Sequence, residues 1–358
     1  MPYTTINKPN LYFDTQLWTG TNASGRTFTG LNFRPDFIYN KCYNSANYYL
    51  NMVDIVRGGT KFLATPVNST EDTASHGQIT SFNSNGTTWA DGTNATYPRL
   101  YYNDGAGSAL GGSEYVSWNW LANGTGVSNT QGSITSTVSA NPTAGFSIVT
   151  YTGAGGASTV GHGLGVIPRM IILKGRSNAR IWVIGHGSLG WTKYMSFDTA
   201  AAQTNNYWND TTPTSSVFSI FNSVNVNGSG ETYVAYCFTD IKGYSKFGSY
   251  VGNGNANGTF VYTGFKPAFI MYKNTATAGT DWVILDVKRD PYNVATEELY
   301  ANLPNAEGTA ANNMDILSNG FKPRRTNASV NESGATIIYM AFAENPFVSS
   351  TQIPTTAR

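Results

Sequence analysis

One phrase occurs three times in the chain and limits the folds that the sequence can adopt. It reads NFRPDFIYNK at residues 32–41, GVIPRMIILK at 165–174 and GFKPAFIMYK at 264–273. In each copy a glycine precedes the proline by 15 residues and a lysine follows it by 6. Equal spacing in three places predicts a chain built from three copies of one unit. The recurring anchors are Gly20, Pro35, Lys41, Gly153, Pro168, Lys174, Gly252, Pro267 and Lys273.

The repeated pattern continues beyond the three lysines. A second apolar stretch ends at Asp54, His186 and Asp286, and each copy closes on an aromatic-rich segment. Length differences between the copies fall in the middle of the unit, where surface loops tolerate insertions. We therefore interpret the anchors as scaffold. The proline opens a core strand and the lysine marks the return of the strand to solvent, whereas a ligand site is expected in the loops where the copies differ.

Local chemistry predicts strands throughout. The apolar segments are short, rich in β-branched and aromatic residues, and bounded by Gly, Asn and Pro. A helical period is suggested by residues 291–303 alone. We predict an all-β fold of three tandem antiparallel β-sandwich units that resemble jelly rolls.

The predicted organisation has six parts. They are an N-terminal attachment or strand-exchange segment (1–16), unit one (17–122), a polar linker (123–144), unit two (145–243), unit three (244–347) and a C-terminal tail (348–358). A short link between units two and three predicts that they pack tightly. The long first linker would let unit one lie apart or cross to a neighbouring chain.

Composition excludes several partners. Charged residues make up 12% of the chain, and its net charge is +1 without a Lys/Arg cluster, so a nucleic-acid partner is not expected. The sequence has neither an apolar run of about 20 residues nor a secretory signal, so we expect no membrane partner and synthesis in the cytosol. Cys42 and Cys237 lie in apolar segments and are predicted to be free, buried thiols.

Catalytic and metal-binding patterns are weak. The three histidines, His76, His162 and His186, occupy unrelated positions of the repeat, and no Cys or His pair has zinc-ligand spacing. We predict an exposed or capping role for His162. No metal or cofactor is expected. The repeated carboxylates Asp54 and Asp286 are interpreted as partners of the arginines three residues later, with catalysis as the alternative.

Binding is better supported than catalysis. Three loops are rich in the aromatic and amide side chains that stack on sugars and bond their hydroxyl groups. The candidate binding residues are Tyr48, Tyr49, Tyr101, Tyr102, Asn206, Tyr207 and Trp208. Packing of the same rings as caps on the sandwiches is the alternative.

Several segments resemble a family of tailed-bacteriophage proteins from phages of aquatic bacteria, described as tail-fibre-like or uncharacterised virion proteins. The segments are residues 3–13, 132–153, 160–174, 243–269 and 340–347. Units two and three are most similar to the family, and unit one departs from it at NKCYNSANYY. The resemblance implies a virion component assembled in the host cytoplasm and exposed outside the cell. It implies no catalytic residue.

The function predicted from these observations is a non-enzymatic virion protein. It would be a tail-fibre or appendage subunit that binds a host-surface glycan or protein, associates with other virion proteins and forms a homo-oligomer, expected to be a trimer. A capsid decoration or cement protein is the first alternative. A glycan depolymerase that uses Asp54 and Asp286 is the second.

Overall fold

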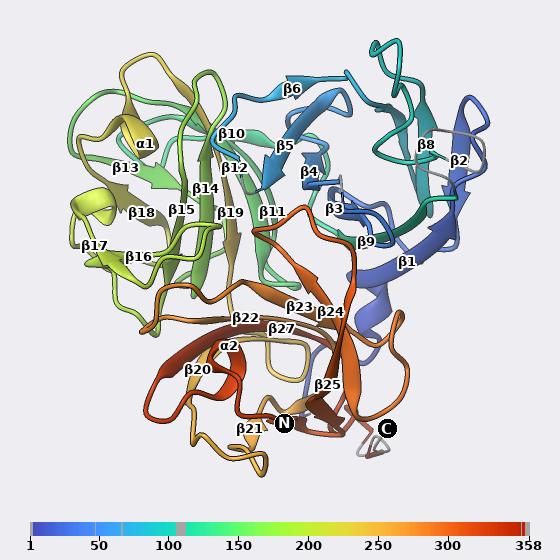
Figure 1. The fold of residues 1–358 in the computed structure, drawn as a ribbon. Coiled ribbons are helices and arrows are strands. Elements are labelled where there is room, and N and C mark those ends of the chain that lie inside the picture. The colour runs from blue at the N-terminus through green and yellow to red at the C-terminus, as the bar shows by residue number, and fades with distance from the viewer. Residues whose placement is uncertain (1–2, 47, 66, 105–111, 352, 355–358) are drawn as a thin grey trace.

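The computed structural model describes residues 3–46, 48–65, 67–104, 112–351 and 353–354. Nearly all of its regular structure is β-strand, and the strand pairs of every sheet are antiparallel, which confirms the all-β prediction. Figure 1 shows three lobes around a common centre: lobe one in blue to cyan, lobe two in green to yellow, and lobe three in orange to red. The helical elements are short: η1 (Pro9–Leu11), η2 (Asn206–Trp208), α1 (Val224–Asn227) and α2 (Ala328–Asn331). Among the described residues, no helix has the length and apolar character needed to cross a membrane.

Lobe one holds a large and a small sheet. The large sheet has the order β1 (Phe13–Thr19), β9 (Glu114–Trp120), β3 (Phe37–Cys42), β4 (Leu50–Asp54), β5 (Lys61–Thr65), β6 (Asp72–Thr73). The small sheet has the order β2 (Arg26–Thr29), β8 (Gly86–Ala90), β7 (Gln78–Asn83).

Lobe two has one large sheet and two short strand pairs. The large sheet has the order β10 (Val127–Asn129), β11 (Ser136–Asn141), β12 (Phe146–Thr152), β19 (Thr232–Phe238), β14 (Met170–Gly175), β15 (Trp182–His186). The pairs are β13 (Ser158–Gly161) with β18 (Val217–Ile220), and β16 (Lys193–Tyr194) with β17 (Gln203–Thr204).

Lobe three is one curled sheet of eight strands. Its order is β20 (Ser245–Val251), β27 (Thr336–Pro346), β22 (Phe265–Asn274), β23 (Val283–Asp286), β24 (Ala295–Tyr300), β25 (Gly308–Leu317), β26 (Gly320–Pro323), β21 (Val261–Tyr262). Residues 295–300 thus form a strand, so the helical period suggested for residues 291–303 was wrong.

Four strands follow the same order in each lobe. The orders are β1-β9-β3-β4, β12-β19-β14-β15 and β20-β27-β22-β23, each with the closing aromatic strand between the first strand and the proline-led strand. The number and pairing of the remaining strands differ between the lobes. The three repeat units and their boundaries therefore stay a prediction.

The closing strands are buried on both faces. Along β19, Val234, Tyr236 and Phe238 enter a central hydrophobic cluster shared by all three lobes. The alternate residues Tyr233, Ala235 and Cys237 enter the separate core of lobe two. Because successive strand side chains point to opposite faces, a strand between two cores needs a continuous apolar run. The aromatic-rich sequence of these strands follows from that position.

The closing aromatic residues of the three lobes meet in the central cluster. The ring centroids of Trp120 and Phe342 are 5.4 Å apart, those of Phe238 and Phe342 are 6.1 Å apart, and those of Trp120 and Phe238 are 6.4 Å apart. Lobe one therefore packs directly against the other two, and the expectation that it lies apart was wrong. The predicted linker 123–144 contains β10 and β11, which extend the sheet of lobe two.

The anchor glycines allow close backbone contact. A Cβ atom at Gly20 would lie 1.9 Å from the carbonyl oxygen of Asp104, and one at Gly252 would lie 2.2 Å from that of Glu332. Gly153 is equally constrained, with 2.3 Å to the carbonyl oxygen of Gly228. No other residue fits such a contact without a backbone shift.

The anchor lysines are buried, so the prediction that they mark a return to solvent was wrong. Lys41, Lys174 and Lys273 are each at most 1% exposed. The Lys41 ammonium donates to the carbonyl oxygens of Tyr48 and Leu303. A lysine at a strand end can therefore bond the backbone of a covering loop, and sequence alone cannot distinguish this from exposure.

Candidate functional site

A polar groove lies where the N-terminal segment crosses lobe three. Its volume is about 590 Å³, and its walls come from residues 7–10, the start of β1, the strands β22 and β27, and the loop after β23. It is placed by the side chain of Ile6, which is buried in the central cluster, and by the packing of Phe13 against Trp120 and Phe342. The predicted attachment segment thus forms one wall of a groove.

Charged side chains of both signs line the groove. The Lys266 ammonium lies 3.0 Å from the Glu344 carboxylate, and the Lys288 ammonium lies 4.0 Å from that of Asp14. Burial raises the pKa of Asp14 above its ordinary value, while the charge of Lys288 acts in the opposite direction. The exposed Lys8 adds a third cation, so the groove holds three lysines and two carboxylates.

Exposed amide groups complete the groove, and an exposed tyrosine follows one of its wall residues in the chain. Asn10 and Asn345 line it and are exposed. Pro291 lines it as well, and the next residue, Tyr292, is 78% exposed. Planar amides and carboxylates bond sugar hydroxyl groups, and an exposed aromatic ring offers a face for stacking. The arrangement suits a polar, uncharged or weakly acidic ligand.

The repeated carboxylates do not form a second site. The Asp54 carboxylate lies 2.5 Å from Arg57 Nε, and both side chains are fully buried. Asp286 lies 2.6 Å from Arg289 Nε, and Arg289 also binds Glu307. Each carboxylate accepts further bonds from backbone N–H groups of the following turn. These geometries match the interpretation of paired, structural carboxylates.

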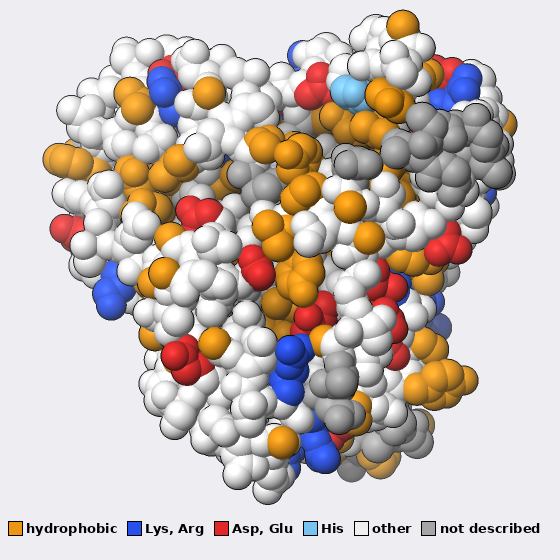
Figure 2. All heavy atoms as spheres, viewed as in Figure 1, with side chains coloured by type: hydrophobic (Ala, Val, Ile, Leu, Met, Phe, Trp, Pro, Cys, Tyr) orange, Lys and Arg blue, Asp and Glu red, His pale blue; other side chains and the backbone are white. Residues whose placement is uncertain are grey.

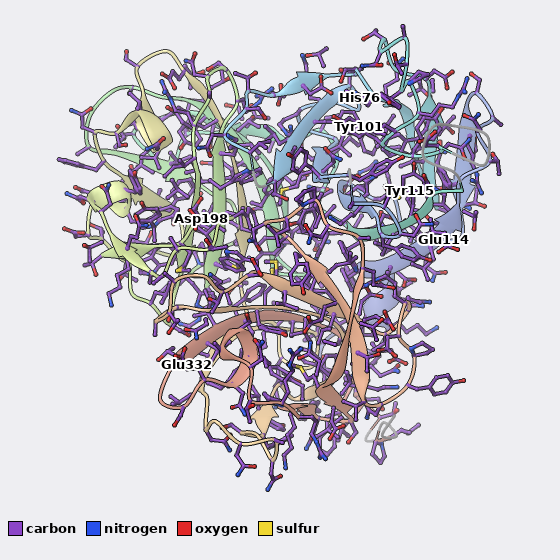
Figure 3. All side chains as sticks on the ribbon, viewed as in Figure 1. His76, Tyr101, Glu114, Tyr115, Asp198 and Glu332 are labelled. Atoms are coloured by element: carbon purple, nitrogen blue, oxygen red, sulfur yellow. The ribbon has the colours of Figure 1, made fainter. Side chains whose placement is uncertain are left out.

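A second cluster of polar side chains surrounds His76 in lobe one. Figure 3 shows His76 and Tyr101 side by side, and their ring centroids are 5.3 Å apart. Ser75 Oγ lies 2.6 Å from Asp72 and 2.5 Å from His76 Nδ1, and the other ring nitrogen of His76 contacts Asn94. A hydrolytic triad places the histidine between serine and carboxylate. Here the serine lies between the other two, so this order does not activate Ser75 as a nucleophile.

A protein-family model matches nearly the whole chain. The model described as "Domain of unknown function (DUF7483)" matches residues 8–346, which cover the three lobes and the groove lining except Asn7. The chain belongs to this family. No protein in the curated comparison matches the chain.

In this DUF7483 protein, four of the predicted binding residues are buried. Tyr48 and Tyr102 donate hydrogen bonds to Asp104 and Asp91 within lobe one. Tyr207 and Trp208 belong to the core of lobe two. These four rings support the packing alternative, because no ligand can reach them without displacing the core.

The other three predicted binding residues are more accessible. Tyr49 is 40% exposed, whereas Tyr101 and Asn206 are half-buried. The Tyr101 hydroxyl is bonded to Asp72. The structure places Tyr49 and Tyr101 in lobe one and Asn206 in lobe two, and none of them lines the polar groove. Their role in binding stays a prediction.

The remaining histidines and the cysteines are buried. His162 Nε2 lies 3.1 Å from the carbonyl oxygen of Thr214 and its Nδ1 accepts from Leu164 N–H, so the histidine caps a turn and is not exposed. Cys42 and Cys237 are free and buried, as predicted. Within the part of the chain that the structure describes, no group of three or more His, Cys, Asp or Glu side chains could hold a metal ion.

Each lobe contains a buried asparagine that the sequence analysis did not predict. The side-chain oxygens of Asn103, Asn227 and Asn331 accept from the backbone N–H of the residue after each anchor glycine, over 2.8 to 2.9 Å. All three residues are fully buried. Alignment of the copies on the closing aromatic residue would have aligned Asn227 with Asn331, while a longer loop displaces Asn103.

Proposed function

We propose that this protein is a non-enzymatic virion component of a tailed bacteriophage, a fibre or appendage subunit that binds a host-surface glycan. The resemblance of residues 132–153 and 243–269 to phage virion proteins supports the virion role. The chain would assemble with other virion proteins and with itself, as a trimer, in the host cytoplasm. Host-surface protein is the second ligand class for the same role.

The polar groove carries the binding proposal. It combines exposed amides (Asn10 and Asn345) with five charged side chains, and the exposed Tyr292 follows the wall residue Pro291 in the chain. Figure 2 shows that charged side chains are sparse on the face in view, where uncharged groups dominate. A surface that is polar without a strong field suits recognition of neutral or weakly acidic sugars through hydrogen bonds and stacking.

A depolymerase is less well supported. Glycoside hydrolysis needs two accessible carboxyl groups on either side of a scissile bond. Asp54 and Asp286, the carboxylates that suggested this alternative, are buried and paired with arginines. A capsid decoration protein remains the other alternative, and the position of the chain in the virion distinguishes it.

Binding of the purified chain to an array of bacterial surface glycans tests the proposal. We expect binding that is weakened in Tyr292→Ala and Asn345→Ala and retained in Tyr49→Ala, a matched exposed tyrosine outside the groove. Loss of binding in Tyr49→Ala alone would move the site to the lobe-one loop. Release of reducing sugar by the wild type would contradict the non-enzymatic role.

A further inference from the structure

We propose that the seam between β20 and β21 of lobe three binds an extended, uncharged peptide segment of a partner protein as an added antiparallel strand on β20. This mode of recognition uses backbone hydrogen bonds at an open sheet edge. The seam is separate from the polar groove, and the inference does not depend on glycan binding.

The outer edge of β20 is free at its centre. Ala343 N–H donates to the Tyr244 carbonyl, and Gly252 N–H donates to the Ala335 carbonyl. These two bonds show which residues of β20 direct their backbone groups toward β27. Lys246, Gly248 and Tyr250 therefore bond β27, and the backbone groups of the residues between them point outward. Among the described residues, neither the N–H nor the carbonyl of Ser249 has an intramolecular partner.

The two neighbours of Ser249 on this edge are partly occupied. Phe247 N–H donates to Asp240 Oδ1 over 2.7 Å, and the Val251 carbonyl accepts from Thr259 Oγ1 over 2.9 Å. The N–H of Phe247 cannot pair with a partner strand, because the Asp240 carboxylate already accepts its hydrogen bond. A partner strand would therefore bond the free N–H and carbonyl groups of Ser249.

Lobe two shows what the same edge accepts. There Thr150 takes the place of Ser249, three residues before the anchor glycine, and it pairs with Thr137 of β11. The β11 strand also crosses the seam to β13, because Ser136 Oγ donates to the Gly161 carbonyl over 3.0 Å. An uncharged strand, residues 136–141, thus pairs with β12 and contacts β13 through Ser136, whereas the corresponding space between β20 and β21 is an open groove.

Lobe one closes its seam by side chains instead. Gln16 Nε2 donates to the Thr29 carbonyl over 2.6 Å and joins β1 to β2. Arg26 donates to the Thr19 carbonyl, also over 2.6 Å, on the outer edge of β1. Lobe three has one comparable bond, from Thr259 Oγ1 to the Val251 carbonyl, and a groove beside Ser249 stays open.

The shape and charge of the open seam match a strand like β11. The seam forms a groove of about 640 Å³ between β20 and β21, whose charged lining residue among those described is Lys246. Its apolar rim includes Val251, Phe260 and Tyr262, which are 46 to 55% exposed. A nearly uncharged groove favours an uncharged segment with alternating small and β-branched side chains, as in residues 134–141.

A synthetic peptide of residues 132–142 (GSITSTVSANP) tests the inference by fluorescence anisotropy with the full-length protein. We expect saturable binding that Ser249→Pro weakens by about tenfold or more, because proline removes the free N–H of the edge. The matched control is Leu17→Pro, which places proline at the equivalent outward position of β1 and leaves binding unchanged. Equal loss in both variants would overturn the inference.

Methylated peptides keep the test decisive if a proline variant fails to fold. In β11 the N–H groups of Thr137 and Ser139 face β12, whereas those of Ser136 and Val138 face β10. N-methylation at Thr137 should abolish binding to the wild type, and N-methylation at Val138 should leave it within about twofold. Equal effects of the two methyl groups, or dimerisation of the protein through β20 that excludes the peptide, would overturn the inference.

Discussion

The Tyr236 hydroxyl of lobe two donates a hydrogen bond to Asp54 Oδ2 of lobe one over 2.8 Å, between two fully buried side chains. Polar groups also bridge the boundary between lobes two and three and the boundary between lobes three and one. His186 Nε2 of lobe two lies 3.3 Å from the Tyr339 carbonyl of lobe three, and Trp118 Nε1 of lobe one donates to Asp286 of lobe three over 3.2 Å. The polar residue that ends the second apolar stretch thus links each lobe to the next.

Removal of the Tyr236 hydroxyl should destabilise the fold. Tyr236→Phe removes one hydrogen bond each from the buried Asp54 and Arg57 side chains, so we expect the free energy of unfolding to fall by about 1 to 3 kcal/mol. Urea denaturation measures the change. The matched control is Tyr244→Phe, because the buried Tyr244 hydroxyl has no hydrogen-bond partner among the described residues and its loss should cost nothing. Equal destabilisation by both substitutions would contradict the role of the bond.

The buried arginine between lobes one and two should be more critical. Arg57 bonds Asp54, Glu71 and Tyr236, and Arg57→Met leaves the buried Asp54 carboxylate without a cation, while Glu71 keeps its pair with Arg176. We expect a loss of about 3 to 5 kcal/mol in the free energy of unfolding. Arg324→Met, which removes a partly exposed arginine paired with Asp315, should change it by less than about 1 kcal/mol. A small effect at Arg57 would show that the ion pair is dispensable.

Much of the fold could be predicted from particular residues. The prolines, the apolar runs after them and the aromatic closing segments predicted strands. The equal spacing of the anchor residues predicted that they occupy equivalent positions in the three copies. The alternation along β19 explains why these segments are apolar at every position, but sequence did not reveal that one face meets a core shared by all lobes. That contact depends on how the lobes are arranged, which no local pattern records.

The site was harder to predict for the same reason. Tyr48 and Tyr102 lie in loops rich in Asn and Gly, which made them candidates for binding. Both residues are nevertheless buried, and their hydroxyl groups donate hydrogen bonds to Asp104 and Asp91. The polar groove combines side chains as distant in sequence as Asn10 and Asn345. No motif joins those positions, so only the fold brings them together.

Acid should destabilise the protein through His186. Burial lowers the pKa of this histidine from 6.5 to about 4 in the folded state. Its Nδ1 accepts from Ser188 N–H, and protonation would remove that acceptor. Between these two pKa values the unfolded chain binds the extra proton, so stability is lost as the pH falls from about 6.5 to 4.

The substitution His186→Gln isolates this effect. The amide keeps one donor and one acceptor but does not titrate, so the acid-dependent loss of about 3 kcal/mol relative to the variant should disappear. Urea denaturation of both proteins between about pH 4 and pH 7 measures the difference. A difference that does not vary with pH would contradict the assigned protonation.

Alkali should stabilise the protein through the buried lysines. Burial lowers the pKa of Lys41 from 10.5 to about 7, and those of Lys174 and Lys273 to about 8. Above the folded pKa the unfolded chain still binds the proton, so stability rises with pH across the window from about 7 to 10. Lys41→Met should reduce that rise by about 2 kcal/mol between about pH 7 and pH 9. Parallel profiles of wild type and variant would contradict the prediction.

The position of this chain in the virion of a phage that encodes it tests the central claim most directly. A cryo-electron microscopy map at a resolution that resolves the three lobes is the measurement. The account predicts symmetric copies of the chain at the tail or another appendage, with the polar groove facing outward. Copies at every capsid lattice point, or absence of the chain from purified virions, would contradict it.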